Sequence, residues 1–174
     1  MIGNDIIDLN ENCQPTERHV NKIYSKDDLN NHSIDDYYKM LSLKESSFKC
    51  LQKYINLQKF IPPHFSIDKD FKFVKFDFFD LPIKILLLDI NNKFIHSIVG
   101  FKKITDYGVC DINDHRDALK NSYIKKYGVI PNLIKVKSKI SPNGYSPPLI
   151  INDLRTSISF SHDGKYSAWA YYTL

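Results

Sequence analysis

The chain has 174 residues, of which 43% are hydrophobic and 25% charged, proportions that fit one ordinary globular domain long enough to bury a core. Its 24 basic and 20 acidic residues leave a formal net charge of +4, which suits an acidic or phosphate-bearing partner but is too diffuse to predict binding to DNA. Because the three cysteines form no C-x-x-C pair and the apolar stretch 83–90 is too short to span a bilayer, we expect a cytoplasmic protein with no disulfide framework, zinc site or membrane segment.

The first predicted element is a short strand over residues 2–9, which is rich in β-branched side chains. Asp5 interrupts its apolar run, and Asp8 follows three residues later. An acid inside such a strand either lies at an exposed edge or binds a cation, and the strand alone leaves both interpretations open.

Residues 17–29 alternate basic and apolar side chains in a way that predicts a short amphipathic helix. Its basic face includes Arg18, Lys22 and Lys26. Taken by itself, a face of this kind is expected to be solvated rather than to bind a specific partner.

The helix predicted over residues 37–55 carries charge beside its apolar face. A capping box at residues 33–36 precedes it. Its apolar residues recur at helical spacing: Tyr37, Met40, Leu41, Phe48, Leu51 and Ile55. Lys44 falls inside that apolar stripe, and Glu45 lies at its edge, one turn before Lys49. Charged groups beside a buried face lose hydration and therefore need a partner such as a phosphate or a metal ion. A simpler interpretation is also open: Glu45 and Lys49 fit a solvated helix pair worth ~0.3–0.5 kcal/mol, and Lys44 can extend its ammonium to water.

The remainder of the chain predicts strands, one helix and a terminal hairpin. The predicted strands cover 71–79, 83–90, 94–101 and 133–140, with a turn at 91–93, a helix over 114–127 that ends at Gly128, and a loop over 141–148. The hairpin joins strands 156–162 and 166–172 through Asp163-Gly164. His162 alone is an ordinary turn residue, but Ser161 and His162 together offer a hydroxyl and an imidazole to an anion.

Three motifs follow one another along the chain: Gly-x-Asp at 3–5, Lys-Glu-Ser-x-x-Lys at 44–49, and Ser-x-Ser-His at 159–162, the last before an Asp-Gly turn and a Tyr-x-Ala strand. In this order they resemble the 4′-phosphopantetheinyl transferase superfamily, and in particular its short holo-acyl-carrier-protein synthase type. Residues 21–28 resemble that type's segment after the first strand. The resemblance covers roughly residues 1–55 and 145–174 and says little about 60–140. Asn4 departs from the family, which commonly has an apolar residue there.

The resemblance implies that the phosphopantetheine arm of coenzyme A passes to a serine of an acyl or peptidyl carrier protein, as in fatty acid or polyketide biosynthesis. The other product is 3′,5′-adenosine bisphosphate. Phosphoryl transfer is catalysed mainly by positioning of the reactants and neutralisation of their charge. A pyrophosphate is usually bound together with Mg²⁺, whose ligands are one or two protein carboxylates, phosphate oxygens and waters. By resemblance, Asp5 and Glu45 match the metal ligands, and Glu45, or a water it holds, is the catalytic base.

The same resemblance assigns the phosphate contacts. Lys44 and Lys49 match residues that hold the coenzyme phosphates, and Lys49 also neutralises or protonates the leaving phosphate as a second catalytic residue. Ser161 and His162 match the Ser-His that contacts those phosphates.

Three further residues match the family outside these contacts. Arg18 and Lys22 lie where the synthases present basic residues to acidic carrier helices, which fits the mild positive charge. Asp8 matches a position that is often acidic.

We therefore expect an α+β fold of the phosphopantetheinyl transferase type, with an antiparallel or mixed sheet packed on a long central helix and one domain over residues 1–174. Mg²⁺ and coenzyme A are the expected cofactor and co-substrate, with no nucleic-acid or membrane partner, and the length is compatible with a homo-oligomer. Two alternatives stay open: a catalytically degenerate relative that binds a carrier protein or nucleotide without transfer, and an unrelated RNA-binding module that would use Phe71, Phe73, Phe76 and Phe78.

Overall fold

The computed structural model describes residues 1–55, 57–128 and 156–173, together with the backbone pairing of four two-residue strands between 129 and 155. The fold is α+β, with a five-stranded and a three-stranded sheet in which every described strand pair is antiparallel. The helices are α1 (Glu17–Ile23), α2 (Lys26–Asn31), α3 (Tyr37–Leu51) and α4 (His115–Tyr127), with 3-10 turns η1 (Ile34–Asp36) and η2 (Pro62–His64).

The two sheets are built from segments far apart in the sequence. In the five-stranded sheet the order is β1 (Ile2–Asp8), β5 (Phe94–Gly100), β4 (Phe79–Ile90), β3 (Phe73–Phe76) and β2 (Phe65–Ile67). In the three-stranded sheet it is β11 (Thr156–Asp163), β12 (Tyr166–Thr173) and β6 (Asp106–Asp111). The four short strands are β7 (Val136–Lys137), which pairs with β10 (Leu149–Ile150), and β8 (Ile140–Ser141), which pairs with β9 (Gly144–Tyr145).

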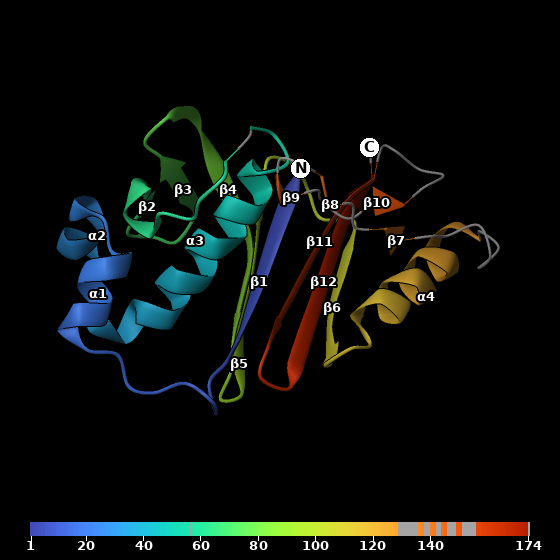
Figure 1. Cartoon of the computed structure of the whole chain (residues 1–174), viewed down its shortest axis with the longest axis horizontal. Coiled ribbons are helices and arrows are strands. Elements are labelled where there is room, and N and C mark those ends of the chain that lie inside the picture. The colour runs from blue at the N-terminus through green and yellow to red at the C-terminus, as the bar shows by residue number, and fades with distance from the viewer. Residues whose placement is uncertain are drawn as a thin grey trace.

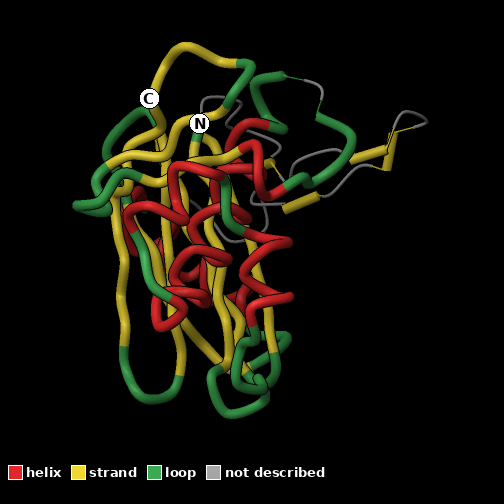
Figure 2. The backbone as a smooth tube through the Cα atoms, turned by 90° about the vertical axis from the view of Figure 1, so that its left-hand side faces the viewer, coloured by secondary structure: helices red, strands yellow, loops and turns green. Residues whose placement is uncertain are grey.

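Each sheet is covered by a helix on one face. Helix α3 lies along the five-stranded sheet and α4 against the three-stranded sheet, while β1 and β11 lie side by side where the sheets meet (Figure 1). Turned by 90°, the tube shows the N-terminal helices in one layer in front of the strands (Figure 2). None of the helices in the described part of the chain is long and apolar enough to cross a bilayer.

Glycine at position 3 lets α3 lie directly on β1. A Cβ at Gly3 would stand 1.9 Å from the carbonyl oxygen of Ser46 and 2.6 Å from the amide nitrogen of Cys50. Only a residue without a side chain fits such a backbone-to-backbone approach. Because α3 lies so close to β1, the side chain of Lys49 on α3 reaches Asp5 on β1.

The seam between β1 and β11 is closed by side chains instead of a backbone ladder. Four alternate N–H groups of β1, those of Ile2, Asn4, Ile6 and Asp8, donate to four alternate side chains of β11, namely Ser157, Ser159, Ser161 and Asp163. Lys53, two residues after the last residue of α3, donates to the carbonyl oxygens of Ile2 and Ile158 and so spans the same seam. β1 is the edge strand of its sheet, and these contacts pair N–H groups that would otherwise lack a hydrogen-bond partner.

Most of the predicted elements are present. The predicted N-terminal strand, the strand over 94–101, the helix over 114–127 and the terminal hairpin are confirmed as β1, β5, α4 and β11–β12. The capping box at 33–36 is present, but it opens the turn η1, and α3 then ends at Leu51. The single helix predicted over 17–29 is wrong, because Ser25 caps a new helix, α2.

The strand predictions over 71–79 and 83–90 correspond to β3 and β4, with β4 starting already at Phe79. Strands β2 and β6 were not predicted, since both are short and lack a long apolar alternation. The strand predicted over 133–140 and the loop over 141–148 lie outside the described residues, apart from the backbone pairings of β7, β8 and β9.

Candidate functional site

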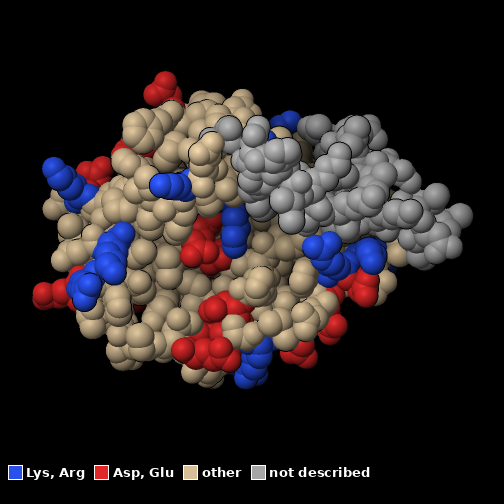
Figure 3. Space-filling model, in the orientation of Figure 1, with Lys and Arg blue, Asp and Glu red and all other residues tan. Residues whose placement is uncertain are grey.

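A cleft of about 320 Å³ opens where α3 crosses the seam between β1 and β11. It is lined by residues from the three elements and the loop after β1: Asp5, Ile6, Ile7, Asn12, Leu41, Glu45, Lys49, Phe160, Ser161, His162 and Asp163. On the space-filling surface, acidic and basic side chains meet in a hollow near the middle of this face (Figure 3). The charged motif residues that are far apart in the sequence therefore share one concave site.

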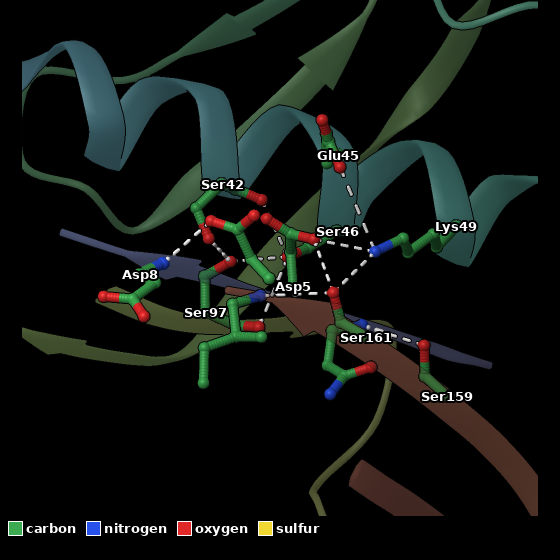
Figure 4. A network of polar contacts seen from close by, with 12 residues as sticks. Asp5, Asp8, Ser42, Glu45, Ser46, Lys49, Ser97, Ser159 and Ser161 are labelled. Atoms are coloured by element: carbon green, nitrogen blue, oxygen red, sulfur yellow. Dashed lines mark hydrogen bonds and ion pairs between the residues drawn. The ribbon is translucent and has the colours of Figure 1, made fainter. Parts of the chain in front are cut away.

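Asp5 lies on the floor of the cleft, with a side chain that is only 5% exposed. Its Oδ1 accepts a hydrogen bond from Lys49 Nζ at 2.7 Å and another from the Ser161 hydroxyl at 2.8 Å (Figure 4). The interpretation of Asp5 as an acid at an exposed sheet edge is therefore wrong, because β11 covers that edge. A buried carboxylate of this kind needs a cationic partner, which Lys49 supplies here.

Glu45 faces Asp5 and Lys49 from α3 (Figure 4). Its Oε2 lies 4.0 Å from Lys49 Nζ, and its side chain is 37% exposed. Loss of water in the cleft raises the pKa of Glu45 above its usual value, and repulsion by the Asp5 carboxylate adds to the rise, while Lys49 opposes it. Two carboxyl groups that repel each other across a cleft form a place where a cation is favoured.

Lys49 joins the elements around the cleft. It is 23% exposed and donates to both Asp5 and the Ser161 hydroxyl, at 2.7 and 3.0 Å, while Glu45 stands further off. The simple interpretation of Glu45 and Lys49 as a solvated helix pair is therefore wrong, because the shorter contacts of Lys49 are with β1 and β11.

Ser161 lies in the cleft, but protein groups already use its hydroxyl. It donates to Asp5 and accepts from Lys49 and from the backbone N–H of Ile6. A hydroxyl has one donor and two acceptor positions, so these three bonds satisfy it. The predicted contact of Ser161 with a coenzyme phosphate is therefore corrected: in this structure Ser161 orients Asp5 and Lys49. Its neighbour His162 is exposed and lines the cleft, as the motif predicts.

Lys44 does not reach the cleft, and its predicted contact with coenzyme phosphates is wrong for this structure. Its ammonium is 0% exposed and forms an ion pair of 2.5 Å with Asp28, which is also 0% exposed. The same Nζ donates to the carbonyl oxygens of Ile23 and Pro62. Burial lowers the pKa of Lys44, and Asp28 offsets part of that effect. The ammonium does not extend to water but ties α3 to the chain around α1, α2 and η2.

Asp8 is a structural acid of the hairpin turn. Its carboxylate accepts the backbone N–H groups of Asn10 and Lys165. A Cβ at Gly164, where φ is +52°, would stand 2.5 Å from Asp8 Oδ2. Asp8 therefore holds the Asp-Gly turn against β1 and is absent from the cleft lining.

The two basic residues assigned to carrier contact lie away from the cleft. Arg18 and Lys22 are both exposed on α1, which packs beside α3. They are one helical turn apart and so share one face of α1.

Two polar lining residues were not predicted as site residues. Asp163 Oδ2 accepts the N–H of Asp8 and an amide hydrogen of Asn12, so the two residues close one end of the cleft. The signal for Asp163 was present in the sequence, because it continues the alternation of Ser157, Ser159 and Ser161 along one face of the strand. For Asn12, which lies in a loop, no pattern in the sequence was informative.

Comparison with protein-family models, with curated proteins and with solved structures found no match for this chain. Within the described residues, no three His, Cys, Asp or Glu side chains are grouped so that they could hold a metal ion by themselves. The cleft holds three carboxylates, of which Asp5 and Glu45 have Lys49 beside them and Asp163 closes one end.

Proposed function

We propose that this protein is a phosphopantetheinyl transferase of the holo-acyl-carrier-protein synthase kind, which moves the phosphopantetheine arm of coenzyme A onto a serine of an acyl or peptidyl carrier protein. The observation that carries the proposal is the convergence of Asp5, Glu45, Lys49 and His162 in one cleft, although they lie in three separate motifs. The α+β architecture, with α3 packed on an antiparallel sheet, supports the corresponding fold type.

The donor set of the cleft fits Mg²⁺ bound together with a pyrophosphate. Mg²⁺ keeps several waters and is commonly held by one or two protein carboxylates plus substrate phosphate oxygens, so a set of three protein ligands is not required. Asp5 and Glu45 would hold it, and the repulsion that raises the pKa of Glu45 is the kind of strain that a cation between them relieves. When bound, the ion would neutralise charge on the pyrophosphate.

In the proposed reaction, the serine oxygen of the carrier forms a bond to the phosphorus on the pantetheine side of the pyrophosphate. The bond from that phosphorus to the bridging oxygen breaks, and 3′,5′-adenosine bisphosphate leaves. Glu45, or a water that it holds, takes the serine proton. Lys49 places its ammonium beside the leaving phosphate oxygen, and His162 holds a phosphate at the cleft wall.

The carrier protein is proposed to dock on the side of α1. Arg18 and Lys22 are exposed there, and basic side chains of this kind attract an acidic helix and orient it before contact.

Of the two alternatives, the RNA-binding module loses its main support. Strand β3 alternates between exposed and buried side chains, so that Phe76 is 7% exposed while Phe73 is 36% exposed. Single-stranded RNA is bound by aromatic rings that lie together on an accessible face, and these phenylalanines are divided between the two faces of β3.

The test of the proposal is an incubation of the protein with coenzyme A, Mg²⁺ and an apo carrier protein, followed by the intact mass of the carrier. We expect the carrier to gain one phosphopantetheine group, and we expect chelation of Mg²⁺ to abolish the gain. A degenerate relative would bind the carrier or the nucleotide without any change in mass, and that result would reject the transfer proposed here.

Replacement of His162 by alanine is expected to weaken coenzyme A binding by about 1.5–3 kcal/mol, the value of a hydrogen bond to a charged group. Because His162 is exposed, the fold should be retained. Calorimetric titration measures the affinity, and His64→Ala, which removes a half-buried histidine paired with Asp77 outside the cleft, is the control. Equal affinities for the two variants would remove His162 from the site.

A further inference from the structure

Three fully buried side chains in the described part of the molecule have polar atoms without a hydrogen-bond partner: Ser167 in β12, and Asn4 and His96 in the five-stranded sheet. The latter two lie on adjacent strands. Both residues are 0% exposed. The unpaired atoms are the amide oxygen and nitrogen of Asn4 and both ring nitrogens of His96. Nearly all buried polar groups in proteins are paired with protein or with ordered water, so four such atoms at one place require a physical account.

The strand register places the two side chains on the same face of the five-stranded sheet. Asn4 is opposite Ile98 and Ile6 is opposite His96, so Asn4 and His96 are diagonal neighbours across β1 and β5. Side chains at such positions start about 7–8 Å apart at their Cα atoms. At this separation the polar ends of the two side chains can both hydrogen-bond to one small molecule placed between them.

That face is turned away from α3 and towards the second sheet. Ser97, which is one residue along from His96, points the other way and bonds Ser42 and Ser46 of α3. On the Asn4 face, Ile98 packs with Ala170 of β12.

The surfaces that face Asn4 and His96 offer few polar partners. The neighbouring residues of β12 are the fully buried alanines Ala168 and Ala170, whose methyl groups are small and cannot form hydrogen bonds. The ring of Tyr107 stands 6.0 Å from that of His96, measured between centroids.

The chemistry of the pair favours a small neutral occupant. Burial lowers the pKa of His96 to about 4, so its ring is neutral and has one donor and one acceptor nitrogen. Asn4 adds an amide donor and an amide acceptor. A set with two donors and two acceptors but no charge suits water, which itself donates twice and accepts twice and is usually held by about three bonds.

We propose that an ordered internal water molecule bridges the side chains of Asn4 and His96 between the two sheets. The water replaces hydration that both side chains lose on folding. Because Asn4 also donates its backbone N–H to Ser159 across the seam, the bridge fixes β1 to β5 beside the point where β1 meets β11. The proposed water site requires the amide of Asn4, and the proposal does not depend on the proposed transferase activity.

A high-resolution crystal structure of the unmodified protein tests this directly. The expected result is a well-ordered density peak within hydrogen-bond distance of the Asn4 amide and of one ring nitrogen of His96. A direct hydrogen bond between the two side chains with no peak between them would overturn the proposal, and so would an empty gap.

Stability measurements on variants give a second, independent test. Asn4→Leu and His96→Phe each remove one side of the bridge and leave the other polar group buried, so each should lower the melting temperature by roughly 4 °C. The double variant should lower it by less than the sum of the two, because no polar group then lacks a partner. Single variants that melt above the wild type would show that the site is dry, and strictly additive losses would show that the two side chains share no water.

Discussion

Replacing Lys44 by methionine is expected to lower the free energy of unfolding by about 3–5 kcal/mol, although Lys44 does not line the candidate cleft. The ammonium of Lys44 and the carboxylate of Asp28 form an ion pair in which both side chains are 0% exposed. Asp28 also accepts the backbone N–H groups of Ser25 and Ile67, so one carboxylate holds α2 and β2 against α3. Methionine keeps the length of the side chain but leaves the Asp28 charge buried without its partner.

The matched control is Lys39→Met on the same helix. Lys39 pairs with Asp36 at 2.7 Å, but these side chains are 29% and 19% exposed, and removal of a partly solvated pair costs about 1 kcal/mol or less. Urea denaturation followed by circular dichroism measures both variants. The double variant Asp28→Asn with Lys44→Met should recover part of the loss, because the amide oxygen still accepts a hydrogen bond and no charge remains. If Lys44→Met is no more damaging than Lys39→Met, the buried pair does not have the role assigned to it.

The case of Lys44 shows what a sequence pattern can and cannot predict. Its position inside the apolar stripe of the helix follows from the 3.6-residue period, and the structure confirms that Lys44 is buried, as are Met40 and Leu51 of that stripe. The other stripe residues are only partly buried, because the fully buried face of α3 is turned towards Leu43, Cys50 and three serines. The partner could not be predicted in the same way, because Asp28 belongs to another helix whose start at Ser25 was itself missed. Periodicity describes one element at a time, whereas the fate of a buried charge depends on the element packed against it.

The candidate site shows the same division between local and long-range information. The motif residues Asp5, Glu45, Lys49 and His162 were predicted from the sequence, and the structure places all four in one cleft. The role of Ser161 could not be predicted, because it follows from a seam in which side chains of β11 accept the N–H groups of a strand 155 residues earlier. No local pattern contains the information that these two strand edges meet.

Regular elements with strong local signals were predicted best. The hairpin turn, the alternation on either side of it and the glycine that ends α4 all act within a few residues, and all are present. The turn itself lies one residue later than predicted, at Gly164-Lys165, because Asp163 still pairs with Tyr166. The short strands β2 and β6 depend on the sheets that receive them, so their own sequences contain little that distinguishes them from loops.

Within the proposed mechanism, Glu45→Gln is expected to reduce the rate of carrier modification by about 10²–10⁴-fold, the range typical for loss of a general base. Glutamine keeps the size and the helix propensity of the side chain, and the contact that is lost with Lys49 is 4.0 Å long and worth only a few tenths of a kcal/mol. The substitution also removes an anionic oxygen from the proposed Mg²⁺ site. The folded state should therefore persist while the chemistry fails, and the readout is the carrier mass as a function of time.

Glu11→Gln is the control for this assay, because Glu11 is an exposed glutamate in the loop after β1 and does not line the cleft. It should modify the carrier at the wild-type rate, and all three proteins should melt within a few degrees of one another. A loss of activity in Glu45→Gln alone, with its fold intact, would locate the proton transfer or the metal contact at this carboxyl group. Near wild-type activity would leave Asp5 and Lys49 as an internal ion pair of the seam and would remove Glu45 from the mechanism.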